Sequence, residues 1–341
     1  MKKILITGGA GFIGINSAKY FLDKGWMVFV LDNFSRAGSE KNIAWLKKDQ
    51  ASKNLKIIRA DIRYDLKILE KLISQVGTVL HLAAQTAVTT SFKNPREDFE
   101  INALGTFNIL EVIRESKNKP IIVFSSTNKV YGGMEDVGVK KIGDRYQYQD
   151  LPYGVAEDRI LDFHSPYGCS NGTADQYVRD YARMYGLRTV VFRQSCIYGP
   201  HQFGIEDQGW VAWFIIATLL GKPLTIYGDG KQTRDVLFVD DLNDAYWLVI
   251  KNIKETSGQI YNIGGGYKNQ LSLLELIGLL EGFLKRKIEY KFDQWRPGDQ
   301  PIFVADIRKA KKDFNWQPKV SVNQGVKKIF KWVNENKGLF R

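Results

Sequence analysis

The sequence is poor in the residues that build disulfide frameworks and metal sites, with 2 cysteines and 3 histidines among 341 residues. Cys169 and Cys196 are too few for a disulfide framework, so we interpret both as reduced thiols. The histidines at 81, 164 and 201 lie far apart in the sequence and do not have the spacing of metal ligands. We therefore expect neither a disulfide nor a metal site.

Long apolar runs are also lacking. No stretch approaches the roughly 18 apolar residues that span a bilayer, and no signal peptide precedes the first predicted strand. We therefore expect a cytoplasmic protein with no membrane partner.

The net charge of +12 could indicate that the protein binds nucleic acid, but Lys and Arg are scattered along the chain. We expect no nucleic-acid partner and interpret the charge as a basic surface around an anionic substrate.

The strongest local motif lies at the N-terminus. Residues 4–6 form a short apolar run that is typical of the centre of a parallel sheet. Glycines follow at a spacing of three, and the amphipathic stretch 16–24 comes behind them. In a strand, turn and helix of this kind, Gly8 allows the tight turn and Gly11 lets the backbone approach a phosphate, while Gly14 lets the helix pack on the strand. The motif predicts a pyrophosphate site.

An acidic residue strengthens this prediction. The second predicted strand, 27–31, ends at Asp32, about twenty residues after the glycines, where a carboxylate can hold the adenosine ribose hydroxyls. The combination predicts dinucleotide binding. NAD is favoured over NADP because the carboxylate of Asp32 would repel a 2′-phosphate.

Strands alternate with helices through the first half of the chain. This alternation predicts an α/β fold with a doubly wound parallel (Rossmann) sheet, whose ligand lies beyond the carboxyl ends of the strands. Beyond residue 195 the alternation becomes irregular, which indicates a smaller C-terminal substrate domain. We predict a cofactor domain of residues 1–195 with 236–263, and a substrate domain of residues 196–235 with 264–341. The further strands and helices predicted for the cofactor domain are 55–59, 78–82, 95–117, 121–125, 166–185, 188–193 and 260–263.

Two groups of polar residues carry the chemistry. Ser125-Ser126-Thr127 follows the fifth predicted strand, and Tyr167 begins a helix that continues through Asn171. With the stretches 7–14, 81–84, 227–236 and 296–299, these residues resemble the extended short-chain dehydrogenase/reductase family. The resemblance covers nearly the whole chain. It implies an enzyme with a Rossmann fold that uses a nicotinamide cofactor to transform nucleotide-sugars.

Three longer stretches are more specific than the glycine loop: residues 125–132, 162–170 and 207–211. They are similar to those of family members that invert C2 of a CDP-linked deoxyhexose, which implies such a substrate, an isomerase and a role in lipopolysaccharide biosynthesis. A 4-epimerase or a 4,6-dehydratase of another nucleotide-sugar is the alternative. The dehydratases need an acid pair after the Thr, and Asn128-Lys129 stands there instead.

The resemblance also implies roles for individual residues. Tyr167, as the tyrosinate, would take a proton from a sugar hydroxyl, and Thr127 would hydrogen-bond the same oxygen. Arg234 and Arg296 match arginines that grip the diphosphate, for which a forked donor is suited. The other substrate candidates are Lys129, Gln208, Trp210, Tyr227 and Asp299. The cofactor candidates are Gly8, Gly11, Phe12, Ile13, Gly14, Asp32, Asn33, Ser35, Arg36, Asp61, Ile62, Leu82, Ala83, Ala84, Asn102, Ser125, Tyr167, Asn171 and Gln194, and we expect Asn102 to brace backbone near the active site.

One position departs from the family pattern. The family has Lys four residues after the catalytic Tyr, where it holds the nicotinamide ribose and lowers the Tyr pKa, whereas this chain has Asn171. An amide can keep a hydrogen bond but supplies no charge, and Lys129 is an alternative source of that charge. We predict a catalytic set of Thr127, Tyr167 and Asn171 with weakened activity. A cofactor-binding module with little turnover is the alternative. We also expect a homo-oligomer.

Overall fold

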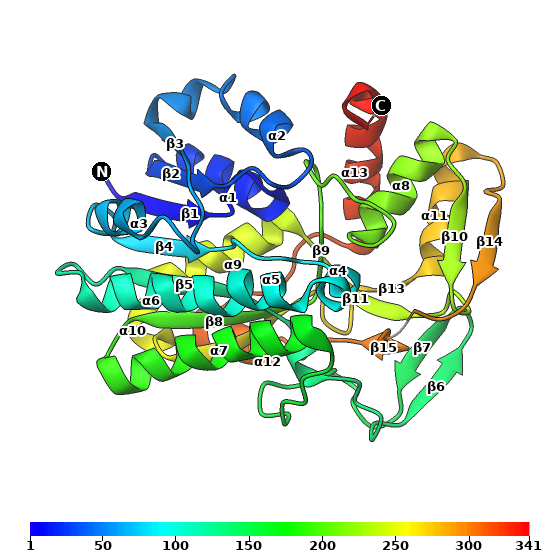
Figure 1. The fold of residues 1–341 in the computed structure, drawn as a ribbon. Helices are drawn as coiled ribbons and strands as arrows, with labels where there is room; N and C mark the ends of the chain where they lie inside the picture. Colours follow the sequence, from blue (N-terminus) through cyan, green and yellow to red (C-terminus); the bar gives the residue numbers. More distant parts are fainter. Residues whose placement is uncertain (297, 341) are drawn as a thin grey trace.

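A seven-stranded, wholly parallel sheet lies at the centre of the computed structural model, which describes residues 1–296 and 298–340 (Figure 1). Its strand order is β12-β8-β5-β4-β1-β2-β3, so the chain starts in the middle and winds outward in both directions. This order confirms the predicted doubly wound Rossmann fold. The strands are β1 (Lys3–Thr7), β2 (Met27–Asp32), β3 (Leu55–Arg59), β4 (Thr78–His81), β5 (Ile121–Thr127), β8 (Thr189–Gln194) and β12 (Gln259–Ile263).

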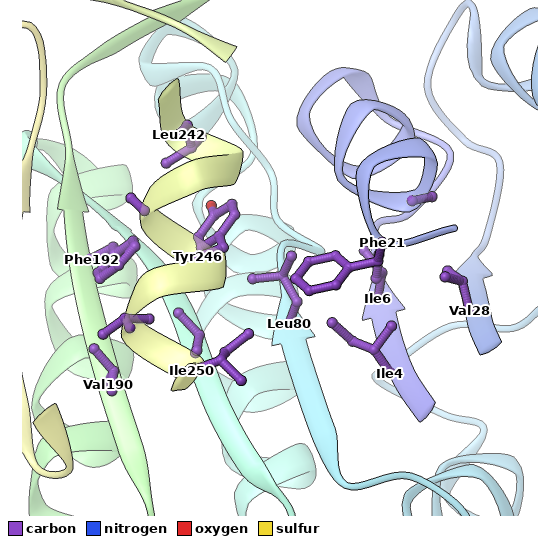
Figure 2. Packing of buried hydrophobic residues seen from close by; sticks show 14 of the residues in the cluster. Ile4, Ile6, Phe21, Val28, Leu80, Val190, Phe192, Leu242, Tyr246 and Ile250 are labelled. Atoms are coloured by element: carbon purple, nitrogen blue, oxygen red, sulfur yellow. The ribbon is translucent and has the colours of Figure 1, made fainter. Parts of the chain in front are cut away.

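Both faces of the sheet are covered, which explains why its strands are almost continuously apolar. Successive residues of β1 point to opposite faces: Ile4 and Ile6 pack with Phe21 in one core (Figure 2), and Leu5 packs in the other. The first core lies under α1 (Phe12–Asp23), α9 (Val239–Lys251) and α12 (Arg308–Phe314). The second lies under α3 (Leu66–Ile73), α6 (Gly105–Glu115) and α7 (Ser165–Tyr185).

The predicted helix 95–117 is present, but its middle is π-helical. The helix runs without a break through α5 (Pro95–Phe99), the π-helical segment η2 (Glu100–Leu104) and α6. A π-helical segment widens the backbone by one residue in a turn, and such segments are frequent at functional sites. Here the segment contains Asn102, which is 2% exposed.

The second half of the chain builds a smaller layer at the carboxyl ends of the large sheet. A four-stranded sheet consists of β9 (Cys196–Tyr198), β11 (Thr233–Phe238), β13 (Gln270–Ser272) and β15 (Ile302–Phe303), and a two-stranded sheet of β10 (Leu224–Tyr227) and β14 (Tyr290–Asp293). Strands β9, β10, β11 and β13 pack with the helices α8 (Trp210–Leu220), α11 (Leu273–Leu284) and α13 (Val322–Glu335) around a core of their own. Helix α8 was not predicted because it is apolar on all sides and therefore shows no helical periodicity.

The remaining elements are short. The stretch 132–159 contains the hairpin of β6 (Val139–Ile142) and β7 (Arg145–Tyr148). The others are α2 (Ser39–Leu46), α4 (Val88–Lys93), α10 (Ile253–Thr256), η1 (Gln50–Asn54), η3 (Asn128–Tyr131) and η4 (Lys337–Phe340).

The proposed division into domains stays a prediction. The segment 236–263 supplies α9 and β12 to the large sheet, as that division requires. Helix α12, which comes later in the chain, packs on the large sheet as well. No helix in residues 1–296 and 298–340 is both long and apolar enough to cross a membrane.

Candidate functional site

A cavity of about 360 Å³ lies at the carboxyl ends of the parallel strands. Its lining comes from the loops after β1, β2, β3, β4, β5 and β8 and from the start of α7. Every residue predicted to bind the cofactor lines this cavity except Asn102. Asn102 lies behind the wall, where its side chain accepts a hydrogen bond from the backbone N–H of Gln85 at 2.8 Å and donates to the Gln85 carbonyl at 3.2 Å.

The glycine turn packs so closely against neighbouring backbone that a side chain would clash at two of its positions. Gly8 has φ +66°, and a Cβ there would lie 2.7 Å from the backbone nitrogen of Ala83. A Cβ on Gly14 would lie 2.3 Å from the Gly8 carbonyl oxygen. Helix α1 begins at Phe12, directly after the turn, so its first N–H groups are free to receive the pyrophosphate of a bound NAD.

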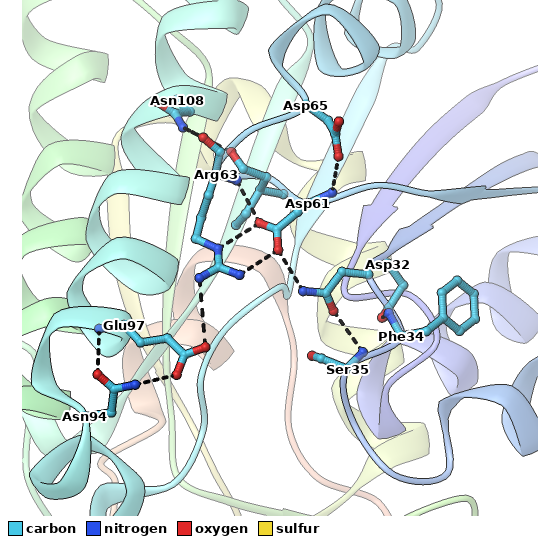
Figure 3. A network of polar contacts seen from close by, with 11 residues as sticks. Asp32, Phe34, Ser35, Asp61, Arg63, Asp65, Asn94, Glu97 and Asn108 are labelled. Atoms are coloured by element: carbon cyan, nitrogen blue, oxygen red, sulfur yellow. Dashed lines mark hydrogen bonds and ion pairs between the residues drawn. The ribbon is translucent and has the colours of Figure 1, made fainter.

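Two acidic residues line the far end of this cavity. Asp32 accepts hydrogen bonds from the backbone N–H groups of Ala10 (3.0 Å) and Phe34 (2.8 Å), while burial raises its pKa. Asp61 is held by the guanidinium of Arg63 at 2.8 Å and by the amide of Asn33 at 2.9 Å (Figure 3). Burial acts to raise the pKa of Asp61, but its bonds with Arg63 outweigh that effect, and the pKa is about 2. Asp61 is therefore ionised and fixed in the wall of this cavity.

A second cavity, of about 340 Å³, adjoins the first and contains all eight residues that were predicted to bind the substrate. Three of these are basic. Arg234 donates to Asp299 at 2.7 Å, and Arg296 forms an ion pair with Asp207 at 3.2 Å. Burial, reinforced by the charge of Arg234, lowers the pKa of Lys129 to about 8. Three cationic side chains could therefore contact an anionic group of a substrate in this cavity, and two of them, Arg234 and Arg296, are held in place by acids.

The two cavities meet at Thr127 and Tyr167, two of the three residues predicted to be catalytic, whereas Asn171 lines only the first cavity. Thr127 ends β5, and Tyr167 lies in the first turn of α7, which begins at Ser165, one residue before the predicted start at Pro166. The lining residues common to both cavities are Thr86, Thr127, Tyr167, Cys196, Gln208, Gly209 and Trp210. A substrate in the second cavity would therefore present its sugar to a cofactor in the first across Thr127 and Tyr167.

Comparison with known proteins decides the family. Residues 5–329 match the family described as GDP-mannose 4,6-dehydratase. The chain belongs to this family. Among curated proteins, the chain is 44% identical to the CDP-paratose 2-epimerase of Salmonella typhi over 97% of this chain and 99% of that one.

Solved structures of similar proteins agree. One is UDP-glucuronic acid 4-epimerase from Bacillus cereus, in complex with UDP-glucuronic acid and NAD, with a TM-score of 0.84, 30% identity and coverage of 98% and 99%. Another is dTDP-glucose 4,6-dehydratase from Streptomyces venezuelae, solved with NAD bound, with a TM-score of 0.85, 28% identity and 99% coverage of both chains. The predictions of an extended short-chain dehydrogenase/reductase, of an enzyme and of NAD as its cofactor are confirmed.

The ionisation of Tyr167 depends on its burial and on three neighbouring side chains. Burial raises the pKa of Tyr167; its contact with Thr127 and the charge of Arg36 lower it, and the charge of Asp98 raises it. Asn171 is 2% exposed, and its amide donates to the Tyr167 carbonyl at 3.0 Å. Lys129 points elsewhere: its amine donates to Gly298 O and to Gln300, each at 3.3 Å.

Sequence reasoning missed a tight turn that separates the two cavities. Residues 205–208 form it, with reciprocal backbone hydrogen bonds of 3.0 Å between Ile205 and Gln208. From the cofactor side, the Arg36 guanidinium donates to Gln208 and to Thr86. From the substrate side, Arg296 binds the turn through Asp207. The two adjacent acids at 206 and 207 were the available signal, because the second of them begins the stretch 207–211 that already resembled the family.

Other lining residues had no signal in the sequence. His201, Gln202 and Phe203 reach the first cavity from a loop after β9, more than one hundred residues from the glycine turn. Within the described parts of the chain, no three His, Cys, Asp or Glu side chains are arranged to hold a metal ion.

Proposed function

We propose that this protein is an NAD-dependent epimerase that inverts C2 of CDP-paratose to give CDP-tyvelose through a 2-keto sugar. The observation that carries the proposal is the 44% identity with a CDP-paratose 2-epimerase over 97% of the chain. The meeting of a dinucleotide cavity with a cationic cavity at Thr127 and Tyr167 supports it.

The chain's own residues would bind and orient the substrate. Arg234 and Arg296 present forked donors, suited to a diphosphate, inside the second cavity. Arg296 also lies 4.0 Å over the ring of Tyr227, which leaves an aromatic face beside the phosphate site. Lys129 adds a donor whose pKa of about 8 leaves it mostly charged near neutral pH. We propose that Gln208, Trp210, Tyr227 and Asp299 complete the subsite for the cytidine, ribose and sugar.

Proton transfer would take place at the junction of the cavities. In the proposed reaction Tyr167 Oη, as the anion, removes the proton from the C2 hydroxyl, and the Thr127 hydroxyl donates to the same oxygen. Bound NAD supplies the acceptor and later the donor of the C2 hydride. Tyr167 then returns its proton to the oxygen after the sugar has turned in the second cavity, so the enzyme ends each turnover as it began.

Two alternatives have specific observations behind them. Relatives that act as 4-epimerases and dehydratases share the fold, but this chain has Asn128-Lys129 where dehydration would need an acid pair. A binding module with little turnover is favoured by Asn171, which supplies no charge to Tyr167.

A panel of nucleotide-sugars separates the candidates. The NAD-loaded protein is mixed with CDP-, UDP- and dTDP-linked sugars while absorbance in the reduced-nicotinamide band is recorded. A transient rise with CDP-paratose, followed by CDP-tyvelose in the products, is the expected result. A response to UDP- or dTDP-sugars alone would replace the proposal with a 4-epimerase or a dehydratase. NAD binding without any response would leave a binding module.

We further propose that the chain forms a homo-oligomer through the face of α5, η2 and α7. Phe99, Leu104, Tyr177, Met184 and Tyr185 are between 39% and 68% exposed on these neighbouring helices. Large exposed apolar side chains gathered on one face are typical of protein–protein contacts. Light scattering of the protein and of Met184→Glu tests this; a monomeric wild type contradicts it.

A further inference from the structure

Behind the catalytic tyrosine lies a buried acid that the proposed reaction does not use. Asp98, on α5, is 1% exposed. One carboxylate oxygen accepts from the Ser170 hydroxyl at 2.5 Å. The other accepts from the amides of Gln85 at 2.7 Å and Asn102 at 3.3 Å. All three donors are neutral, so the carboxylate is hydrogen-bonded but its charge is not compensated.

The basic residues around this acid are engaged elsewhere. Arg63 pairs with Asp61 and, at 3.9 Å, with Glu97, and Arg96 bonds Glu100 at 3.2 Å. In residues 1–296 and 298–340, no lysine, arginine or histidine forms an ion pair with Asp98. Burial of an unpaired carboxylate is costly, and here it raises the pKa of Asp98.

This acid is connected directly to the catalytic helix turn. Ser170, its hydroxyl donor, lies between Tyr167 and Asn171 on α7 and also approaches the Tyr167 carbonyl at 3.2 Å. The charged groups that act on Tyr167 are Asp98 from α5 and Arg36 from the loop after β2. Lys93, on α4, is exposed, and Asn171 on α7 is neutral.

We propose that Asp98 is a positioning residue with two effects: its hydrogen bonds fix the first turn of α7, and its charge opposes the ionisation of Tyr167. This inference rests on the proposed function, in which Tyr167 acts as the anion. A cation at position 171 would offset the charge of Asp98, but the neutral Asn171 does not offset it. In this chain Asp98 therefore limits the fraction of active enzyme near neutral pH.

The two effects of Asp98 can be separated by substitution. Asp98→Asn removes the charge and keeps an amide that can bond Ser170, whereas Asp98→Ala removes both the charge and the hydrogen bonds. Glu97→Gln is the matched control, because it neutralises an exposed acid of the same helix that faces Arg63. Each variant is loaded with NAD, and the pH–rate profile is recorded with CDP-paratose.

We expect Asp98→Asn to move the alkaline midpoint of the profile to lower pH and to raise the rate at about pH 7 by roughly tenfold, as removal of one nearby charge predicts. Asp98→Ala should show the same shift of the midpoint with a lower maximum rate, and Glu97→Gln should match the wild type. If only one of Asp98→Asn and Asp98→Ala folds, the pH–rate profile of that variant is sufficient for the test. An unshifted midpoint in a folded neutral variant overturns the proposal and leaves Asp98 a purely structural residue.

A second readout does not require turnover. Protein with ¹³C-labelled tyrosine rings is titrated by NMR with NAD bound, and the Tyr167 signal is assigned from Tyr167→Phe. Ionisation of Tyr167 at lower pH in Asp98→Asn supports the inference even when no sugar reacts, in which case only the proposed function fails. Identical titrations in wild type and Asp98→Asn refute it whatever the substrate.

Discussion

Replacing Asn171 by Lys should raise the rate at which the protein turns over CDP-paratose near neutral pH. The side chain at 171 is 2% exposed, lines the cofactor cavity and lies one helical turn after Tyr167, with its amide 3.0 Å from the Tyr167 carbonyl. Side chains four residues apart on a helix are neighbours, so an added ammonium would come within about 6 Å of the phenol. At an effective dielectric of about 20, that charge is worth about 3 kcal/mol, or a rate gain of up to about 100-fold.

The sign of the pH dependence follows from the environment of Tyr167. Its pKa is raised, first of all by burial, so at neutral pH only a small fraction is the reactive anion. A cation at 171 would lower that pKa. The gain should therefore be largest at neutral pH and disappear at high pH, where Tyr167 ionises without help.

The assay is a pH–rate profile with CDP-paratose for the wild type, Asn171→Lys and Asn171→Met. The Met variant is the control, because it has nearly the length of Lys and no charge. Equal rates for the Lys and Met variants at about pH 7 would refute the electrostatic reasoning. Tight NAD binding in all three proteins would show that the cofactor site has survived the substitutions.

Three further predictions concern other parts of the site. Because the carboxylate of Asp32 lies at the end of the first cavity and would repel a 2′-phosphate, NAD should bind more tightly than NADP. The difference between the two affinities should be smaller in Asp32→Ala. Tighter binding of NADP by the wild type in a titration would show the assignment to be wrong. Removing Arg234 or Arg296 deletes a forked donor and leaves Asp299 or Asp207 unpaired, so calorimetry should show CDP affinity reduced by about tenfold or more. Burial raises the pKa of Asp235 to about 7, whereas the pKa of an Asp in an unfolded chain is about 4. The contribution of Asp235 to the free energy of unfolding is therefore greatest below about pH 4 and is lost as the pH rises to about 7. The free energy of unfolding of Asp235→Asn, measured in urea, should therefore depend less on pH in that window than that of the wild type.

The parts that the sequence predicted are those set by local chemistry. The glycine turn and Asp32 lie within one strand–helix–strand unit, where spacing and residue type already define the geometry. Strand β3 was predicted with the bounds that the structure shows, because it is a short, largely apolar run between polar loops. Even the return of β12 to the edge of the large sheet could be anticipated from an isolated apolar run.

The parts that it did not predict depend on contacts between distant residues. Asp98 resembles any surface acid of an amphipathic helix until the π-helical segment and α7 enclose it, and Ser170 is 72 positions away. Arg36 and Gln208 are separated by 172 positions, and nothing in either local sequence indicates the other. Helix α8 lacks periodicity because all its sides are apolar, which conceals it from pattern analysis.

The proposal of C2 inversion is tested most directly by the fate of the hydrogen at C2. The NAD-loaded protein is incubated with CDP-paratose in deuterated water, and the sugar is followed by NMR. We predict conversion to CDP-tyvelose with the original hydrogen retained at C2, because a hydride that is held by bound NAD does not exchange with water before it returns to the sugar. Absence of any inversion, or inversion with deuterium incorporated at C2, would contradict it.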